Sequence, residues 1–127
     1  MRDRIFAFAA GLALAAAGSG IGAARAAGDA NKGAAFYEDN CTGCHSLDAN
    51  RVGPRHRGVY GRKAGTVPDF DYSDALRKSG VVWDETTLNR WLSGPMDYIK
   101  GAAMPFRISS PEVRADIIAF LRRESGK

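Results

Sequence analysis

The clearest amphipathic pattern in the chain lies near its end. Apolar residues there fall at positions i, i+4, i+7 and i+8, which form one face of a helix. These residues are Val113, Ile117, Phe120 and Leu121. Ser110 is a suitable N-cap, Pro111 suits the first helical position, and Gly126 follows the last apolar residue. The pattern therefore predicts a helix that begins after Ser110 and ends before Gly126.

Two other segments also predict helices. The first covers residues 30–40 and follows Asp29, a residue type that favours the N-cap position. The second starts at Asp84 and ends before the Gly94-Pro95 pair, which cannot continue a helix. The first helix has an apolar character, which comes from Ala34, Ala35, Phe36 and Tyr37. In the second helix the expected buried face consists of Leu88, Trp91 and Leu92.

The middle of the chain, residues 48–71, reads as a long loop. Five glycines and prolines precede Pro68, namely Gly53, Pro54, Gly58, Gly61 and Gly65. A loop this long is unusual in a small domain, which indicates that it wraps something other than polypeptide. A short helix is expected over residues 73–79, ended by Gly80, and another short turn after Pro95. Because no strand-like alternation persists anywhere, the predicted fold class is all-α.

The N-terminal region has the pattern of a secretory signal peptide. A positively charged start and an uncharged, alanine-rich run precede Ala24-Arg25-Ala26, which places small residues where a signal peptidase cleaves. We therefore predict a signal peptide over residues 1–26 and one domain over residues 27–127, exported to the periplasm and soluble after cleavage. The alternative is a retained anchor, since residues 5–24 could just span a membrane, although they are weakly apolar and rich in glycine.

Charge and size narrow the interpretation further. Three arginines and one aspartate in residues 1–26 account for half of the formal net charge of +4, so the expected mature chain is close to neutral. The basic balance is therefore poor support for binding nucleic acid or an anionic membrane. A chain of about a hundred residues buries a modest core and often relies on a cofactor or a crosslink.

The most specific feature of the chain is Cys41-Thr42-Gly43-Cys44-His45. Two thiols at this spacing can reach two adjacent vinyl groups of one haem, and the next residue, His45, can then serve as an axial ligand of the iron. A thioredoxin-like pair is the first alternative, but the βαβ pattern is missing. A zinc site lacks ligands, because only His56 remains nearby. A disulfide is the third alternative.

The second axial ligand decides between a carrier and an enzyme. Met104 lies in a loop of small residues, Gly101-Ala102-Ala103, that can approach a flat ring closely, and it follows the attachment motif by about sixty residues. Met96, beside Pro95, is the weaker candidate, and either methionine could simply fill the core. A bound thioether would saturate the iron and favour its reduced state.

The sequence resembles the class I, mitochondrial-type cytochrome c family, as also found in small soluble bacterial cytochromes c. Besides the attachment motif and Met104, the matching segments are Gly53-Pro54, Gly61-Arg62-Lys63-Ala64-Gly65, Phe70-Asp71-Tyr72-Ser73-Asp74-Ala75, Val82-Trp83-Asp84, Tyr98-Ile99-Lys100-Gly101 and Arg114-Ala115-Asp116-Ile117-Ile118-Ala119-Phe120-Leu121. The resemblance implies an all-α fold of three main helices with short helices and loops wrapped round one covalent haem c.

The resemblance also implies roles for individual residues. Pro54 matches the proline whose carbonyl accepts a hydrogen bond from the proximal histidine. The groups that hold the two haem propionates are matched by Arg62, Tyr72 and Trp83. The contact where the first and last helices cross is matched by Gly33 and Phe120.

Three matching positions beside the expected methionine ligand depart from the family. A polar cluster is usual there, whereas this chain has Leu76, Trp91 and Ala102, so the Trp91 indole N–H is the one remaining donor. A drier pocket disfavours the ferric charge and should raise the reduction potential. Loss of a hydrogen bond to the Met104 sulfur would instead loosen that ligand.

The expected docking surface differs too. The family's haem edge is ringed by lysines, but the matching positions here include Asn40, Met96 and Ala103, so electrostatic steering to an acidic partner is in doubt. Phe106 is expected against the haem edge. His56 stands where an apolar residue is usual and is interpreted as a loop histidine.

Three functions remain in competition at this stage. The favoured one is a monomeric electron carrier that docks transiently on a redox donor and acceptor and binds no nucleic acid. A haem enzyme or gas sensor would need an open iron site and a distal acid–base group, and a thiol oxidoreductase would use Cys41 and Cys44 without haem.

Overall fold

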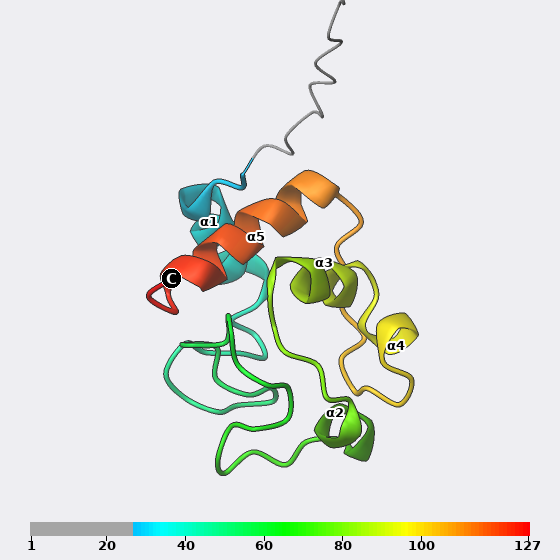
Figure 1. Ribbon diagram of the computed structural model, residues 1–127. Helices are drawn as coiled ribbons and strands as arrows, with labels where there is room; N and C mark the ends of the chain where they lie inside the picture. The colour runs from blue at the N-terminus through cyan, green and yellow to red at the C-terminus, as the bar shows by residue number, and fades with distance from the viewer. Residues whose placement is uncertain (1–26) are drawn as a thin grey trace, which may run out of the picture.

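The computed structural model describes residues 27–127, and this part of the chain contains five helices (Figure 1). They are α1 (Ala30–Asn40), α2 (Asp74–Lys78), α3 (Glu85–Ser93), α4 (Pro95–Tyr98) and α5 (Pro111–Arg123). The all-α prediction is confirmed, and so are the three main helices and both short ones. The predicted signal peptide, its cleavage site and the alternative membrane anchor lie outside the described residues.

The helices begin where the sequence predicts, because the expected caps are formed. The Asp29 carboxylate accepts hydrogen bonds from the first amides of α1. Asp84 and Thr87 form a reciprocal capping box, with Thr87 N–H donating to Asp84 at 2.9 Å and Asp84 N–H donating to the Thr87 hydroxyl at 2.8 Å. The Ser110 hydroxyl accepts the Val113 amide of α5 at 3.2 Å. These caps satisfy amides that would otherwise lack partners at the helix starts.

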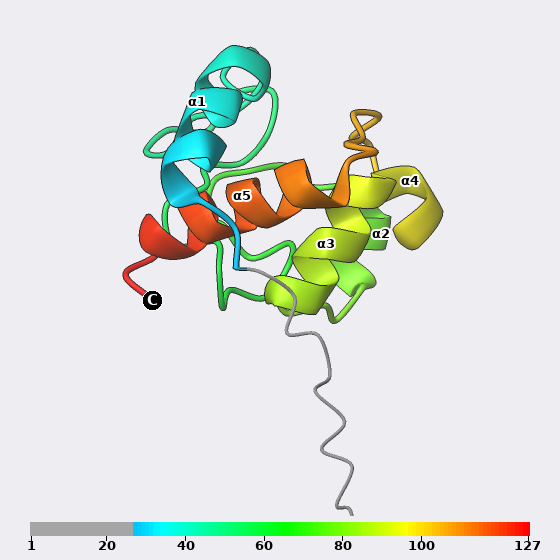
Figure 2. The same ribbon diagram turned by 90° about the horizontal axis from the view of Figure 1, so that it is seen from above.

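Helices α1 and α5 cross at close range, as Figures 1 and 2 show. A Cβ on Gly33 of α1 would lie 2.0 Å from the Asp116 carbonyl oxygen and 2.9 Å from the Phe120 Cβ, so only glycine fits there. The same Asp116 accepts the Asp29 amide on its carboxylate at 2.7 Å. The crossing expected at Gly33 and Phe120 is therefore confirmed, and it ties together the two ends of the described chain.

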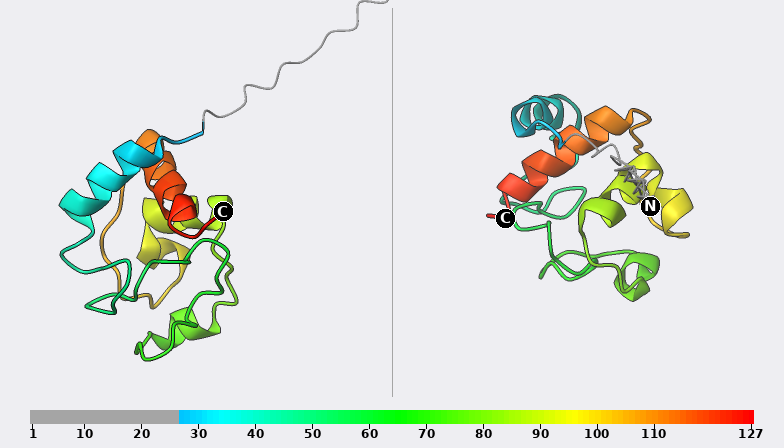
Figure 3. Two further views of the ribbon diagram at one scale, coloured as in Figure 1. Left: turned by 90° about the vertical axis from the view of Figure 1, so that its left-hand side faces the viewer. Right: turned by 45° about the horizontal axis from the view of Figure 1, so that its top comes forward.

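The long loop between α1 and α2 is also confirmed. Within residues 27–127 the only β-pairing is one isolated antiparallel bridge, between Lys63 and Val82. Figures 1 and 3 show the loop running away from the α1–α5 crossing towards α2. No helix in the described part is long and apolar enough to cross a membrane.

The burial of one side chain differs from the prediction, and the burial of another was not predicted. Leu88 and Leu92 of α3 are buried as predicted, whereas Trp91 is only half-buried. On α5 the polar Arg114 is buried together with the apolar stripe. Its guanidinium is satisfied there, since Nη1 donates to the Ile108 carbonyl at 2.8 Å and Nε donates to the Asn89 side chain at 2.8 Å.

Candidate cofactor site

The attachment motif forms a tight turn at the end of α1. Cys41 caps the helix and donates its amide to the Tyr37 carbonyl at 2.8 Å. The amides of Cys44 and His45 both donate to the Cys41 carbonyl, at 3.1 and 2.8 Å. The two thiols are free, with Cys41 half-buried and Cys44 exposed. One turn of backbone therefore presents two thiols and an imidazole together, as covalent attachment of a haem requires.

The backbone after the motif orients His45. Its Nδ1–H donates to the Pro54 carbonyl at 2.9 Å, which leaves Nε2 as the nitrogen available to a metal. Gly53 makes this approach possible, because a Cβ there would lie 2.1 Å from His45 Cε1. Burial lowers the pKa of His45, against the smaller opposing effect of the Pro54 hydrogen bond. The ring is therefore held neutral, the form in which imidazole binds iron.

The sequence did not predict what His56 does. Its ring stacks on that of His45, with centroids 3.9 Å apart and planes inclined by 20°, and its Nδ1 shares a 3.0 Å hydrogen bond with the Tyr37 hydroxyl. Burial lowers the pKa of His56 well below its usual range, and repulsion from the Arg62 guanidinium, and from His45 whenever that ring is protonated, lowers it further. The available signal was a histidine two positions after Pro54, where the family has an apolar residue.

Arg62 and Trp83 are brought together by backbone pairing. The Trp83 amide donates to the Arg62 carbonyl at 2.9 Å, and the Gly61 amide donates to the Trp83 carbonyl at 2.6 Å. Trp83 is buried, and Arg62 is half-buried. The isolated bridge between Lys63 and Val82 continues this pairing. A short two-stranded contact thus places an arginine beside a tryptophan from a segment twenty residues away.

The Arg62 guanidinium has carbonyl partners only. It donates to Arg55 at 2.9 Å and to Arg57 at 3.2 Å, and no carboxylate of residues 27–127 forms a salt bridge with it. Burial lowers its pKa, and Tyr72, which is buried nearby, raises it in part. A half-buried cation without a counter-charge suits an anionic ligand, and a haem propionate has that chemistry. The residues present therefore fit a haem.

The other predicted residues come from the second half of the chain. Trp91 of α3 packs on Trp83, with ring centroids 5.3 Å apart. Leu76 is half-buried and Ala102 is buried, and neither side chain can form a hydrogen bond. Met104 is half-buried in the segment between α4 and α5.

The segment that carries Met104 and Phe106 is fixed at its far end. The Ile108 amide donates to the Leu92 carbonyl at 2.8 Å, and Arg114 donates to the Ile108 carbonyl. Within residues 27–127 no hydrogen bond or ring contact links Met104 or Phe106 directly to the cluster around His45. The Met104 side chain is more enclosed than that of Met96, which is 49% exposed on α4.

A surface ion pair lies beside Phe106. Arg107 donates to the Asp97 carboxylate at 2.7 Å, and Lys100 lies 4.0 Å from the same carboxylate. Phe106 itself is 40% exposed. Asp97 therefore partly neutralises both Arg107 and Lys100 on this surface.

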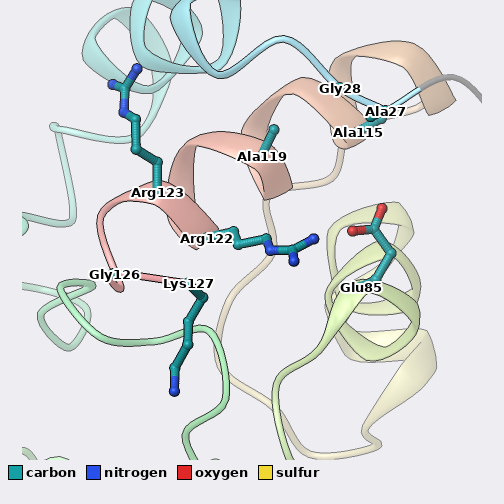
Figure 4. Close-up of a pocket in the computed structure, with 9 residues that line it drawn as sticks. All are labelled: Ala27, Gly28, Glu85, Ala115, Ala119, Arg122, Arg123, Gly126 and Lys127. Carbon is teal, nitrogen blue, oxygen red and sulfur yellow. The ribbon is translucent and has the colours of Figure 1, made fainter.

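Two pockets lie on the surface of residues 27–127, one away from His45 and one behind it. One, of about 420 Å³, lies between α5 and α3, and Figure 4 shows Arg122 and Glu85 pointing into it from the two helices. None of the predicted site residues lines this pocket. The other, of about 430 Å³, lies behind the attachment turn, where Tyr37, His45 and Phe120 line it. The chemistry is concentrated at the attachment motif, so neither groove is taken as the functional site.

Comparison with known proteins places this arrangement in context. The family model described as cytochrome c matches residues 30–124. Cytochrome c of Cochliobolus lunatus is 40% identical over 102 residues, covering 77% of this chain and 94% of that protein. Cytochrome c2 of Rhodomicrobium vannielii is 42% identical over 108 residues, covering 82% and 86%. The solved structure of cytochrome cH from Methylobacterium extorquens is 42% identical, with a TM-score of 0.72, and covers 76% of this chain and 99% of that one.

Proposed function

Because the chain belongs to the cytochrome c family, we propose that it shuttles single electrons between redox partners in the periplasm, with its iron held between His45 and Met104. The protein has the class I cytochrome c fold, is a haem c electron carrier, and has one haem, attached through Cys41 and Cys44. When bound, the haem supplies an iron that gains and loses one electron without a change of ligands.

The observation that carries the proposal is the orientation of His45. Its Nδ1–H is engaged by the Pro54 carbonyl at 2.9 Å, so Nε2 is left to bind the metal on the proximal side. The hydrogen bond also makes the imidazole a stronger donor, as such outer contacts do in other metal sites. Arg62, Tyr72 and Trp83 are assigned to the propionates, since Arg62 forms no salt bridge with any carboxylate of residues 27–127.

Met104 is assigned as the second axial ligand because of its surroundings. Its loop is rich in small residues, and its half-buried side chain is more protected than the exposed Met96. A thioether bound on this side leaves no open position for oxygen or peroxide, which favours a carrier over a haem enzyme. A thiol oxidoreductase is disfavoured too, because burial raises the pKa of Cys41 to about 11 and keeps that thiol un-ionised at neutral pH.

The compartment and the partners follow from the sequence pattern. Residues 1–26 have the order of charged, apolar and small residues that directs export, and cleavage after Ala26 releases residues 27–127 as a soluble monomer. The donor and acceptor dock transiently where Phe106 lies near the haem edge. Intact mass of the purified protein tests the cleavage, since a retained leader adds the mass of 26 residues.

The assignment of Met104 is tested by paired substitutions in protein from a host that attaches haem. We expect a low-spin c-type spectrum with the weak far-red methionine band, and no rapid binding of cyanide or carbon monoxide. Met104→Ala should abolish the band and open the iron to carbon monoxide, whereas the matched control Met96→Ala should leave both unchanged. Loss of the band in Met96→Ala alone would overturn the assignment, and colourless protein with two reactive thiols would overturn the whole proposal.

A further inference from the structure

We propose that His56, anchored by Tyr37, is a positioning residue that fixes the plane of the His45 imidazole. The inference rests on the proposed function, since it takes His45 as an axial ligand. It goes further by assigning a role to two residues outside the expected haem contacts. An axial histidine can rotate about its bond to the metal, so the side chain that packs on its face decides which orientation it keeps.

The stacking geometry is the first observation. The rings of His56 and His45 lie 3.9 Å apart at 20°, which is close to parallel. A flat ring in this arrangement resists rotation of its neighbour, because any tilt brings ring atoms into contact. The Pro54 hydrogen bond fixes which nitrogen of His45 faces the metal. The His56 ring restrains the remaining rotation of the His45 ring about its bond to the metal.

The position of His56 is itself fixed from two directions. Its amide donates to the Ser46 carbonyl at 3.0 Å, and the next amide, that of Arg57, donates to the Leu47 carbonyl at 2.8 Å. This pairing places His56 beside the residues that directly follow His45. At the side chain, Nδ1 shares the 3.0 Å hydrogen bond with the Tyr37 hydroxyl, which sets the rotation of the His56 ring.

Tyr37 connects this stack to the helix crossing. Its ring lies 5.0 Å from that of Phe120 on α5 and 5.6 Å from that of His56, edge to face. Four rings in contact therefore run from α5 through α1 and the loop to His45. A leucine at position 56 would fill the same space, but it could neither stack as a plane nor accept a hydrogen bond from Tyr37. This distinguishes a positioning role from simple core filling.

The test is proton NMR and low-temperature EPR of the ferric holoprotein. The haem-methyl shifts and the g-values report the orientation of the axial imidazole plane. If His56 only fills space, its substitution should leave both unchanged. We expect His56→Leu to reorder the haem-methyl shifts and Tyr37→Phe to move them in the same sense by less. His56→Phe, which keeps a flat ring, should stay closer to the wild-type pattern than His56→Leu. Tyr60→Phe, whose hydroxyl lies outside this stack, is the matched control and should change nothing.

The outcomes separate this inference from the proposed function. Wild-type protein without a low-spin spectrum would overturn the axial role of His45 itself. A normal wild-type spectrum with unchanged shifts in Tyr37→Phe and His56→Leu would overturn only the positioning role. If His56→Leu does not fold, Tyr37→Phe decides alone, because it removes a single hydroxyl. Identical patterns in His56→Phe and His56→Leu would also overturn the inference, since ring stacking would then have no effect.

Discussion

The indole rings of Trp83 and Trp91 pack with their centroids 5.3 Å apart and their planes tilted by 59°. Trp83 is buried and is one of the proposed propionate contacts, and Trp91 stands on the proposed methionine side, where the family resemblance predicts a polar side chain. The pair joins the two halves of the site through an apolar contact. In the proposed site, a polar group introduced at position 91 would lie close to the iron.

Trp91→Tyr should lower the reduction potential. A hydroxyl at this position adds a dipole that stabilises the ferric charge, by an amount on the order of tens of millivolts if one hydrogen bond is involved. Equilibrium titration with redox mediators measures the change. Trp91→Phe is the control, because it keeps an apolar ring and should not lower the potential. An unchanged potential in Trp91→Tyr would contradict the role assigned to the dry pocket.

Gly33→Ala should destabilise the protein. The added Cβ would lie 2.0 Å from the Asp116 carbonyl oxygen, so the two helices must move apart, at a cost of about 1–3 kcal/mol. Denaturant unfolding followed by circular dichroism measures the free energy. The control is Ala35→Ser on the exposed face of α1, which is expected to stay within about 0.5 kcal/mol of wild type. Equal stability of the two variants would refute the close crossing.

Asp48→Asn should make stability less sensitive to acid. The bidentate hydrogen bonds from Arg57, at 2.5 and 3.0 Å, lower the pKa of Asp48 in the folded state. A carboxylate whose pKa is lower in the folded than in the unfolded state stabilises the protein at pH values above its unfolded pKa of about 3.9. This contribution is lost as the pH falls through the folded pKa.

Urea midpoints between neutral and strongly acidic pH test this effect of Asp48. The difference between wild type and Asp48→Asn should be constant near neutral pH and shrink below about pH 4. Asp39→Asn, an exposed change outside this ion pair, is the control. A difference that persists unchanged into acid would show that the ion pair has no part in the acid response. Since Asp48 is exposed, high salt should also reduce the difference.

Asp97→Asn should restore steering towards an acidic partner. Asp97 neutralises Arg107 at 2.7 Å and lies 4.0 Å from Lys100, so its removal leaves two cations unopposed beside Phe106. In stopped-flow reactions with an acidic redox protein, we expect the association rate at low ionic strength to rise by about twofold to tenfold. The wild type should depend only weakly on salt. Asp69→Asn adds the same charge elsewhere, and an equal rise there would mean that overall charge, not this surface, controls docking.

Local signals predicted the secondary structure well. Asp29, Asp84 and Ser110 begin their helices because a capping side chain satisfies free amides whatever the rest of the fold does. The attachment motif is equally local, since two thiols and a histidine on one turn need no distant partner. The roles of these residues are predictable because the interactions that define them involve only neighbours a few positions away in the chain.

Contacts between distant segments were not predictable in the same way. The resemblance named Arg62 and Trp83 as propionate contacts but did not predict their backbone pairing, and an arginine alone reads as a solvated charge. The stacking of His56 on His45 was missed, because ring packing between two loop residues leaves no periodic trace. The burial of Arg114 could not be predicted from its polarity either. It lies on the buried side of α5 because its guanidinium donates to three oxygens, those of Asn89, Ile108 and Ser109.

The crossing of α1 and α5 affects the order in which the chain would fold during the proposed export. A chain that leaves the cytoplasm from its N-terminus delivers Gly33 long before Asp116 and Phe120, so α1 has no packing partner until nearly the whole chain has emerged. During the proposed export, Cys41 and Cys44 would therefore lie on a segment that has not yet docked against α5. On that route, a domain held together by the contact between α1 and α5 would keep both cysteines accessible until haem is attached.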